Sequence, residues 1–403
     1  SHTLGGRARV VAKDGWRVDN GQHILLGAYT ELTRLLRLTG VSPKTLQHLP
    51  LLLHNPGHLH IQAAPLPAPL HLAVGLLRAR GLRWADRLAM LRFMHALRRG
   101  GWRADPAQTV AGLLRAQRQS EALQKLIWEP LCVAALNTPL AEASAQIFVN
   151  VLRDSLGADA SASEVLIPRV DLSELFPVPA ARYLAVRRGK LRTGNAIDAI
   201  RREDRRFFLD GDPGRAGYDQ LVIATAPHHA APLLASAGHC ERLAAQIDAL
   251  PSEPIATVYL ALGDGVRLPH PMIGVSGGPA QWVFDRAQFG GRNGLLAAVI
   301  SARGAHEALG RDELVLAVHK QLEEVLGRRL PTPEWSQVIT EKRATFACRP
   351  GLLRPSGGRT PLPGLWLAGD YTDSDYPATL EAAVRSGVSC AAHILRHAGQ
   401  TRD

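Results

Sequence analysis

The sequence predicts an α/β fold in which one layer is assembled from three separated segments and the stretches between them form a second domain. Two observations predict this arrangement. Short apolar runs bounded by glycine or charged turns, typical of buried strands, occur near residues 10, 222 and 366. The segments between them are longer, and much of their length has helical spacing with many leucines and arginines. A chain of 403 residues is also too long to fold around one hydrophobic core of ordinary size, which favours two domains.

The first segment of the layer lies at the start of the chain. Residues 4–9 read Leu-Gly-Gly-Arg-Ala-Arg, a glycine-rich loop that leads into a strand-like run at residues 9–12. A second strand-like stretch covers residues 16–23. This part of the chain is therefore expected to form a loop followed by two short strands.

The second and third segments each contain a short apolar run. In the second, alternation at residues 183–186 predicts a strand, residues 188–190 a turn, and residues 221–227 a buried strand. In the third, residues 364–370 predict a strand that ends in a glycine turn. A helix from about residue 379 to 397 should follow, because its apolar residues form one stripe: Leu380, Ala383, Val384, Gly387, Val388, Ala391, Ile394 and Leu395.

The stretches between these segments have a different pattern. A proline-rich break occupies residues 65–69 of the long helical stretch. Farther along, residues 256–262 and 295–300 predict strands, and residues 312–326 predict a helix. We expect these stretches to form an α+β domain inserted into the layer.

Composition indicates a globular protein, with 46% apolar and 21% charged residues. The cysteines are far apart, show no Cys-x-x-Cys pair and have no histidines at metal-ligand spacing, so we expect buried reduced thiols and no metal site. They are Cys132, Cys240, Cys348 and Cys390. No run approaches the roughly 18 apolar residues of a spanning helix, and no signal pattern opens the chain. We therefore expect a cytoplasmic protein.

The net charge of +11 is compatible with nucleic acid, an anionic membrane surface or an acidic ligand as partner. The sequence has no zinc knuckle, ribonucleoprotein motif or basic tail, so nucleic acid is not expected. Residues 70–103 hold eight arginines against the single acidic Asp86. We expect this stretch to form a basic amphipathic helix. Such a helix predicts either peripheral contact with an anionic membrane, at the inner face of the cytoplasmic membrane, or an ordinary arginine-rich solvent face.

Residues 364–370 and 376–387 resemble the C-terminal FAD motif of the flavin amine oxidases and phytoene desaturases. The resemblance implies that Gly369 and Asp370 contact the ribityl and pyrophosphate region of FAD. It also implies that a helix N-terminus at Thr379, Leu380 and Glu381 faces the flavin, where its dipole would stabilise the negative charge of the reduced ring. Asp370 could alternatively cap a helix.

Residues 4–9 are similar to the loop that follows the ribose-binding acidic residue in the same family. The resemblance implies that Gly5 and Gly6 let the backbone approach FAD and that Arg7 faces phosphate. Residues 19–29 and 134–139 narrow the resemblance to the bacterial hydroxysqualene dehydroxylases. Further contacts with FAD are expected from the following residues: Gly21, Gln22, Val186 and Ala226.

The resemblance implies an FAD/NAD(P)-binding Rossmann-like domain made of discontinuous segments. We assign residues 1–23, 183–230 and 346–403 to it, and residues 24–182 and 231–345 to the substrate-binding domain. The family's G-x-G-x-x-G turn does not occur in the sequence, and we expect that unit to lie upstream of Ser1. Without it, the chain is expected to bind FAD weakly and to be poorly soluble.

The activity that the resemblance implies is the reductive dehydroxylation of hydroxysqualene to squalene, in hopanoid biosynthesis. Such a reaction needs a polyisoprenoid substrate, FAD, an unidentified electron donor and a proton donor for the departing hydroxyl. His23 is the first candidate for the proton donor, with Asp373, Asp375 and Tyr376 as alternates. Each could instead be structural or solvated. A carotenoid desaturase, a flavin amine oxidase and a non-catalytic membrane-associated scaffold of the same fold remain alternatives.

Overall fold

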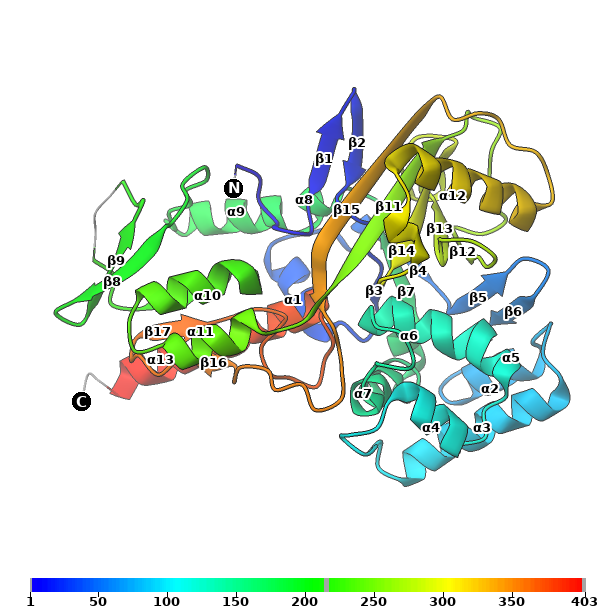
Figure 1. Ribbon diagram of the computed structural model, residues 1–403, viewed down its shortest axis with the longest axis horizontal. Coiled ribbons are helices and arrows are strands. Elements are labelled where there is room, and N and C mark those ends of the chain that lie inside the picture. Colours follow the sequence, from blue (N-terminus) through cyan, green and yellow to red (C-terminus); the bar gives the residue numbers. More distant parts are fainter. Residues whose placement is uncertain (1, 214–216, 401–403) are drawn as a thin grey trace.

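The computed structural model of the chain describes residues 2–213 and 217–400 and shows an α/β fold with two lobes (Figure 1). One lobe contains the C-terminal helix and a small sheet, and the other contains a larger sheet and most of the helices. Helix α1 (Thr30–Leu38) packs against the C-terminal helix, although we assigned residues 24–182 to the other domain. The boundaries between the two domains are therefore still a prediction from the sequence.

The smaller lobe is built on a three-stranded sheet. Its strands, in spatial order, are β10 (Leu221–Ile223), β17 (Leu365–Leu367) and β16 (Gly358–Arg359). β10 and β17 run parallel and β16 is antiparallel to β17. Two of the predicted apolar strands are thus confirmed and lie next to each other.

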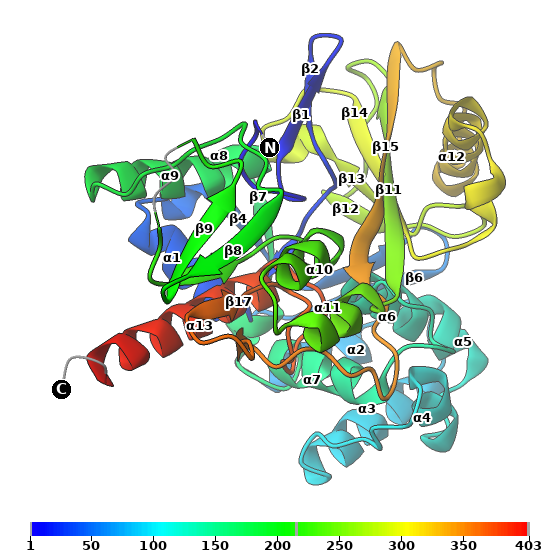
Figure 2. The same cartoon turned by 60° about the vertical axis from the view of Figure 1, so that its left-hand side comes forward.

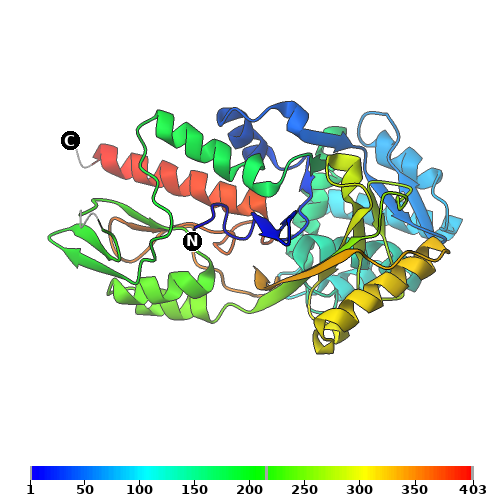
Figure 3. The same cartoon turned by 90° about the horizontal axis from the view of Figure 1, so that it is seen from above.

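Helices cover both faces of this sheet (Figure 3). α13 (Leu380–Gln400) lies on one face, where Trp366 packs with Cys390. α10 (Pro227–Ser236) and α11 (Glu241–Asp248) lie on the other face. Alternate residues of a strand point to opposite faces, which explains why the short apolar run of β17 is buried throughout.

The N-terminal segment forms a hairpin of β1 (Val10–Lys13) and β2 (Trp16–Asp19). Asp14 and Gly15 join the strands with φ of 52° and 75°, as a type I′ turn requires. The two predicted strands are confirmed, although the second ends at Asp19. Trp16 stacks on Trp335 with 4.7 Å between ring centroids, which fixes the hairpin to the larger sheet.

The larger sheet is antiparallel and has five strands. Their spatial order is β12 (Met272–Gly274), β13 (Trp282–Asp285), β14 (Leu295–Ser301), β11 (Ser252–Ala261) and β15 (Trp335–Phe346). α12 (Arg311–Leu326) packs against this sheet, and β11 and β15 run side by side along it (Figure 2). The strands predicted at 256–262 and 295–300 and the helix at 312–326 are confirmed.

The remaining elements form the helical part of the larger lobe and its connections. Its helices are α2 (Leu70–Leu77), α3 (Trp84–Arg99), α4 (Val110–Ala116), α5 (Glu121–Leu123), α6 (Glu129–Leu136) and α7 (Ala145–Ser155). Its strands are β3 (Leu25–Leu26), β4 (Leu46–Leu49) and β7 (Val165–Pro168) in one sheet, and β5 (Leu52–Asn55) with β6 (Leu59–Gln62) in a hairpin. The helices α8 (Leu172–Leu175) and α9 (Pro177–Val186) and the hairpin β8 (Ala199–Glu203) with β9 (Arg206–Asp210) lead back to the small sheet.

Two predictions of secondary structure are wrong. The alternation at residues 183–186 lies in helix α9, because proline in the first turn starts a helix there and four residues are too few to fix a period. The basic stretch at 70–103 is two helices, α2 and α3, and not one, because a loop that contains Gly81 separates them. Gly81 has φ of 85°, and a Cβ there would lie 1.8 Å from the carbonyl oxygen of His58.

The predictions for the cysteines and for membrane spans can also be compared with the structure. All four cysteines are unpaired and buried, as expected. Across residues 2–213 and 217–400, no helix has both the length and the apolar character needed to span a bilayer.

Candidate functional site

The carboxyl ends of the parallel strands β10 and β17 define the edge at which the predicted residues gather. β10 leads to Ala226, which precedes the first turn of α10, and β17 leads to Gly369 and Asp370. Ligands of open α/β sheets bind at this edge, beside the N-termini of the helices that follow. The Gly369 N–H donates to the hydroxyl of Ser386 over 2.9 Å, which fixes the turn against α13.

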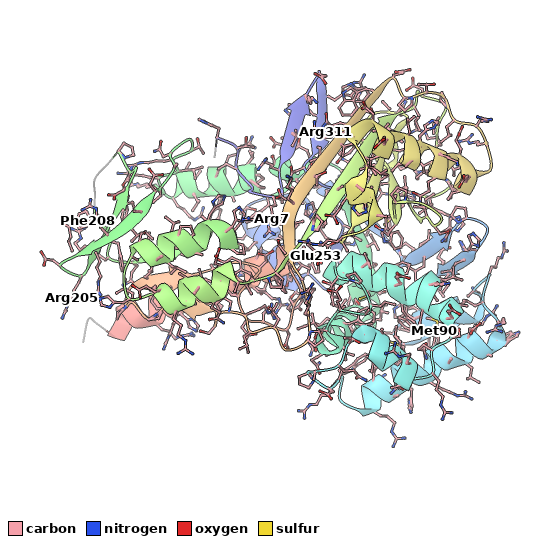
Figure 4. All side chains as sticks on the ribbon, in the orientation of Figure 1. Arg7, Met90, Arg205, Phe208, Glu253 and Arg311 are labelled. Atoms are coloured by element: carbon pink, nitrogen blue, oxygen red, sulfur yellow. The ribbon has the colours of Figure 1, made fainter. Side chains whose placement is uncertain are left out.

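Arg7 and Asp370 form an ion pair at this edge, 363 positions apart in the sequence. The Arg7 guanidinium lies 2.7 Å from the Asp370 carboxylate, whose side chain is only 10% exposed. The same guanidinium donates to the carbonyl of Ala344, and the Asn20 amide donates to the Arg7 carbonyl over 3.2 Å. Figure 4 labels Arg7 between the two lobes. The structure thus brings the first and third predicted segments together.

The loop before Arg7 has a backbone conformation that favours glycine. Gly5 has φ of +99°, and a Cβ there would lie 2.2 Å from the carbonyl oxygen of Ala8. Gly6 has φ of +59° and no atom within 4 Å of a Cβ position. The open backbone at Gly6 would let a ligand approach closely, as the sequence resemblance implies.

A buried polar network holds the loop of Gly21, Gln22 and His23. Asp19 accepts the Leu172 N–H over 2.8 Å and lies 3.5 Å from the Arg286 guanidinium. Arg286 also donates to the Gln22 side-chain oxygen over 2.9 Å. Burial raises the pKa of Asp19 to about 6, although Arg286 opposes this shift.

His23 lies beside Gly21 in this loop, in a site that disfavours a charged imidazole. Burial, with a smaller contribution from Arg7, lowers the pKa of His23 to about 4. The ring is therefore neutral at pH 7. A Cβ on Gly21 would lie 3.9 Å from both the His23 Nε2 and the Thr257 hydroxyl, so these groups share one small space.

The three alternate proton donors lie in one loop whose backbone is held by Arg354. Its guanidinium donates to the carbonyls of Thr372 and Tyr376, over 3.2 and 3.0 Å, and to that of Ser374. The carboxylates of Asp373 and Asp375 point outward, with side chains 72% and 70% exposed. Both residues are thus placed near the site but face solvent.

Tyr376 is half-buried and differs from the two aspartates. The Arg385 guanidinium lies 4.7 Å from its ring centroid. Burial, and then a hydrogen bond to Asp154, raise the pKa of Tyr376 to about 12. Tyr376 therefore keeps its proton at neutral pH.

The start of α13 is as predicted, but the Glu381 side chain has an internal partner. The Thr379 hydroxyl accepts the Ala382 N–H over 3.1 Å, so Thr379 caps the helix. Glu381 is fully buried and accepts the backbone N–H groups of Glu31 and Leu32, over 3.1 and 2.8 Å. Its carboxylate caps α1, which leaves the backbone N–H groups around Leu380 for a ligand.

Val186 lies away from the other predicted residues. Its side chain is 81% exposed at the end of α9, on a groove between α9 and α1. The site is reached by the other end of this helix, where Pro177 lies 2.9 Å from a Cβ position on Gly5. Nine residues of helix separate the two, roughly 14 Å. The helix that replaced the predicted strand explains the difference.

Two buried hydroxyls support a polar ligand at this site. Tyr371 follows Asp370 and is 1% exposed, and Thr257 adjoins Gly21. Neither hydroxyl has a hydrogen-bond partner among the residues that the structure describes. Buried polar groups normally have partners, so these two are suited to a ligand. With the Arg7 cation, the open glycine backbone and the helix N-termini, they fit FAD.

The fold and this site define a flavin-dependent oxidoreductase. The family model of the flavin containing amine oxidoreductases matches residues 1–395, and the chain belongs to that family. It is an enzyme that uses FAD.

Curated proteins that resemble this chain include hydroxysqualene dehydroxylases. The chain is 28% identical to a hydroxysqualene dehydroxylase of Zymomonas mobilis, over 98% of this chain and 92% of that protein. It is 32% identical to a hydroxysqualene dehydroxylase of Rhodopseudomonas palustris, over 66% of this chain and 61% of that protein.

Solved structures share the fold. An oxidoreductase from Methanosarcina mazei is 15% identical with a TM-score of 0.70, covering 96% of this chain and 91% of that one. Cyclohexylamine oxidase from Brevibacterium oxydans is 15% identical with a TM-score of 0.63, covering 98% and 92%. These likenesses confirm the α/β fold predicted from the sequence.

Sequence reasoning did not single out Asp19, Arg286, Arg354 or Thr257 as residues of the site. Asp19 stands in the quoted loop motif, and its place directly before Asn-Gly-Gln-His was a signal that could have been used. Arg286 and Arg354 lie in stretches without a recognisable pattern, and only the fold brings them to the loops that they hold.

Proposed function

We propose that this enzyme removes the hydroxyl group of hydroxysqualene reductively and yields squalene. The observation that supports the proposal is the similarity to hydroxysqualene dehydroxylases, one of which aligns over 98% of this chain. Reduced FAD, when bound, supplies the hydride that replaces the hydroxyl. The Gly5–Arg7 loop, Asp370 and the start of α13 bind and orient the cofactor. The hydroxyl leaves as water, so the protein must also deliver a proton.

We propose Tyr376, in place of His23, as the proton donor. Tyr376 is half-buried, keeps its proton at neutral pH and has a fixed backbone. His23 is neutral at pH 7, so it lacks the second proton that an imidazolium would donate. Asp373 and Asp375 face solvent, with side chains 72% and 70% exposed, and are less suited to a site from which water is excluded. The assignment of Tyr376 as the proton donor is part of this proposal.

The test is a product assay with the flavin-loaded protein, photoreduced without oxygen and given hydroxysqualene. We expect squalene to form in proportion to the reduced flavin that is oxidised. Parallel incubations of the oxidised enzyme with phytoene and with putrescine test the desaturase and amine oxidase alternatives. Oxidation of either substrate without any squalene formation would contradict the proposal. A protein that stays free of flavin even when FAD is added in excess would favour the non-catalytic scaffold.

We further propose that α2 and the exposed face of α3 contact an anionic membrane, from which a polyisoprenoid substrate can be drawn. Large apolar side chains stand exposed there beside arginines: Leu66, Leu70, Leu77, Trp84 and Leu88, which are 40–68% exposed. Figure 1 places α2 and α3 together at the end of the molecule far from the C-terminus. Exposed apolar groups interleaved with cations are typical of interfacial helices.

Not every arginine of this stretch is available to a membrane. Arg87 donates to the carbonyls of Leu77 and Ala79, each over 2.6 Å, and so holds the end of α2. Arg83 pairs with Asp86 over 3.0 Å. In the described part of the chain, no carboxylate lies within ion-pair distance of Arg92, Arg98 and Arg99, which makes them the better test positions.

Changing Arg92, Arg98 and Arg99 to glutamate is expected to weaken binding to liposomes that contain anionic lipid at least tenfold. Each basic residue near such a surface contributes about 1 kcal/mol at moderate ionic strength. Co-sedimentation measures the binding, and the flavin spectrum checks the fold. The control carries the same charge change at exposed arginines elsewhere, in Arg182, Arg242 and Arg311. Equal loss in both triple variants would indicate a general charge effect and contradict the docking surface.

A further inference from the structure

Three histidines that the proposed reaction does not use meet where the β5–β6 hairpin packs against the larger sheet. His54 in β5 and His60 in β6 stand directly opposite each other in the hairpin register. His270 comes from the segment that precedes β12, the strand against which β5 packs. Figure 1 shows the hairpin next to the β12 end of the sheet.

The ring nitrogens of these histidines converge. The Nδ1 atoms of His54 and His60 are 3.2 Å apart, and one nitrogen from each of the three rings lies within 4.8 Å of the others. Zinc–nitrogen bonds of about 2.0–2.1 Å at tetrahedral angles place two ligand nitrogens about 3.3 Å apart. The first pair already has this spacing, and the third ring needs a small movement to reach it.

The backbone holds the three side chains in place from two directions. Cross-strand pairing in the hairpin fixes His54 against His60. His270 stands between Pro269 and Pro271, whose rings restrict the chain. The Pro271 carbonyl accepts the Asp285 N–H over 3.0 Å. A cation that binds the three rings would therefore join two separately anchored elements.

The rings also have the right chemistry for a metal. Neutral imidazole is a good ligand for zinc and related divalent ions. All three side chains are partly exposed, so an ion can reach them.

We propose that His54, His60 and His270 bind one divalent transition-metal cation, with Zn²⁺ as the expected ion. Three protein ligands leave a fourth tetrahedral position for water. The bound ion links the β5–β6 hairpin to the larger sheet and stabilises their contact, independently of the flavin reaction. Sequence spacing did not reveal the site, because His270 lies 210 positions from His60.

Calorimetric titration of the flavin-loaded protein with zinc chloride, after chelator treatment and dialysis, tests this proposal. We expect one zinc ion per chain at micromolar affinity or tighter. His54→Ala, His60→Ala and His270→Ala should each weaken binding at least tenfold, because two imidazoles hold zinc poorly. The matched control is His58→Ala, since His58 is an exposed histidine in the turn of the same hairpin.

Zinc should also raise the melting temperature of the parent protein and of His58→Ala, but not that of the three ligand variants. Circular dichroism without zinc checks that each variant folds, and a glutamine replacement is measured at any position where alanine does not. Equal zinc affinity in all variants, or no binding at 100 μM zinc, would show that the three rings only pack against one another.

Discussion

Replacing Asp370 by alanine is expected to weaken FAD binding by the purified protein roughly 10- to 100-fold. A hydrogen bond to a charged group contributes about 1.5–3 kcal/mol, and every 1.4 kcal/mol is a factor of ten in affinity. The carboxylate also holds the Arg7 guanidinium at 2.7 Å. Without the carboxylate, the cation that the site offers to phosphate is no longer held in position. Flavin content from the visible spectrum and affinity from ultrafiltration measure the effect.

The matched control for this prediction is Asp219→Ala. Asp219 lies before β10, at the end of the strand pair opposite the site, and its side chain is 84% exposed. We expect its flavin content to equal that of the parent. Asp370→Asn keeps the shape of the side chain, so its flavin content should fall between those of Asp370→Ala and the parent. Parental affinity in Asp370→Ala, with a parental melting temperature, would refute the role given to Asp370.

The elements that could be predicted from sequence are those whose burial leaves a long or sharply bounded pattern. α13 has an apolar stripe over several turns, and β17 is an apolar run between glycines. The four residues at 183–186 carry too little pattern, and the better signal was the pair Pro177 and Pro179 at the start of α9. The secondary structure of a short segment is thus determined by the residues at its boundaries and by tertiary packing.

In the site, too, some residues could be predicted from the sequence and others could not. Gly5, Gly6, Arg7 and Asp370 were expected near FAD because two local motifs resemble a known family, and the structure brings these motifs together. Arg286 and Arg354 hold the site through bonds to backbone and side chains distant in sequence. A local motif specifies ligand-facing atoms, whereas the residues that support them can come from any segment that the fold brings close.

Asn137 shows how much such a supporting residue can contribute to stability. It ends α6 in the left-handed conformation, with φ of 48°, and is 4% exposed. Its amide donates to the Pro254 carbonyl over 3.2 Å and to the Thr345 hydroxyl over 2.9 Å. Its side-chain oxygen accepts the Ala302 N–H over 2.6 Å. One side chain therefore joins the helical part to the β11, β14 and β15 region.

Asn137→Ala is expected to lower the free energy of unfolding by about 3–5 kcal/mol. Buried groups left without partners cost about 1–3 kcal/mol each, and alanine in the left-handed region adds about 1 kcal/mol. Glycine adopts the left-handed conformation without this cost. If the hydrogen bonds dominate, Asn137→Gly should therefore lower the free energy of unfolding by about 1 kcal/mol less than Asn137→Ala. Exposed Asn195→Ala should change stability by less than about 0.5 kcal/mol. Urea unfolding followed by circular dichroism measures all three. A loss below 1 kcal/mol in both Asn137 variants would mean that the three remote segments are held together by apolar packing alone.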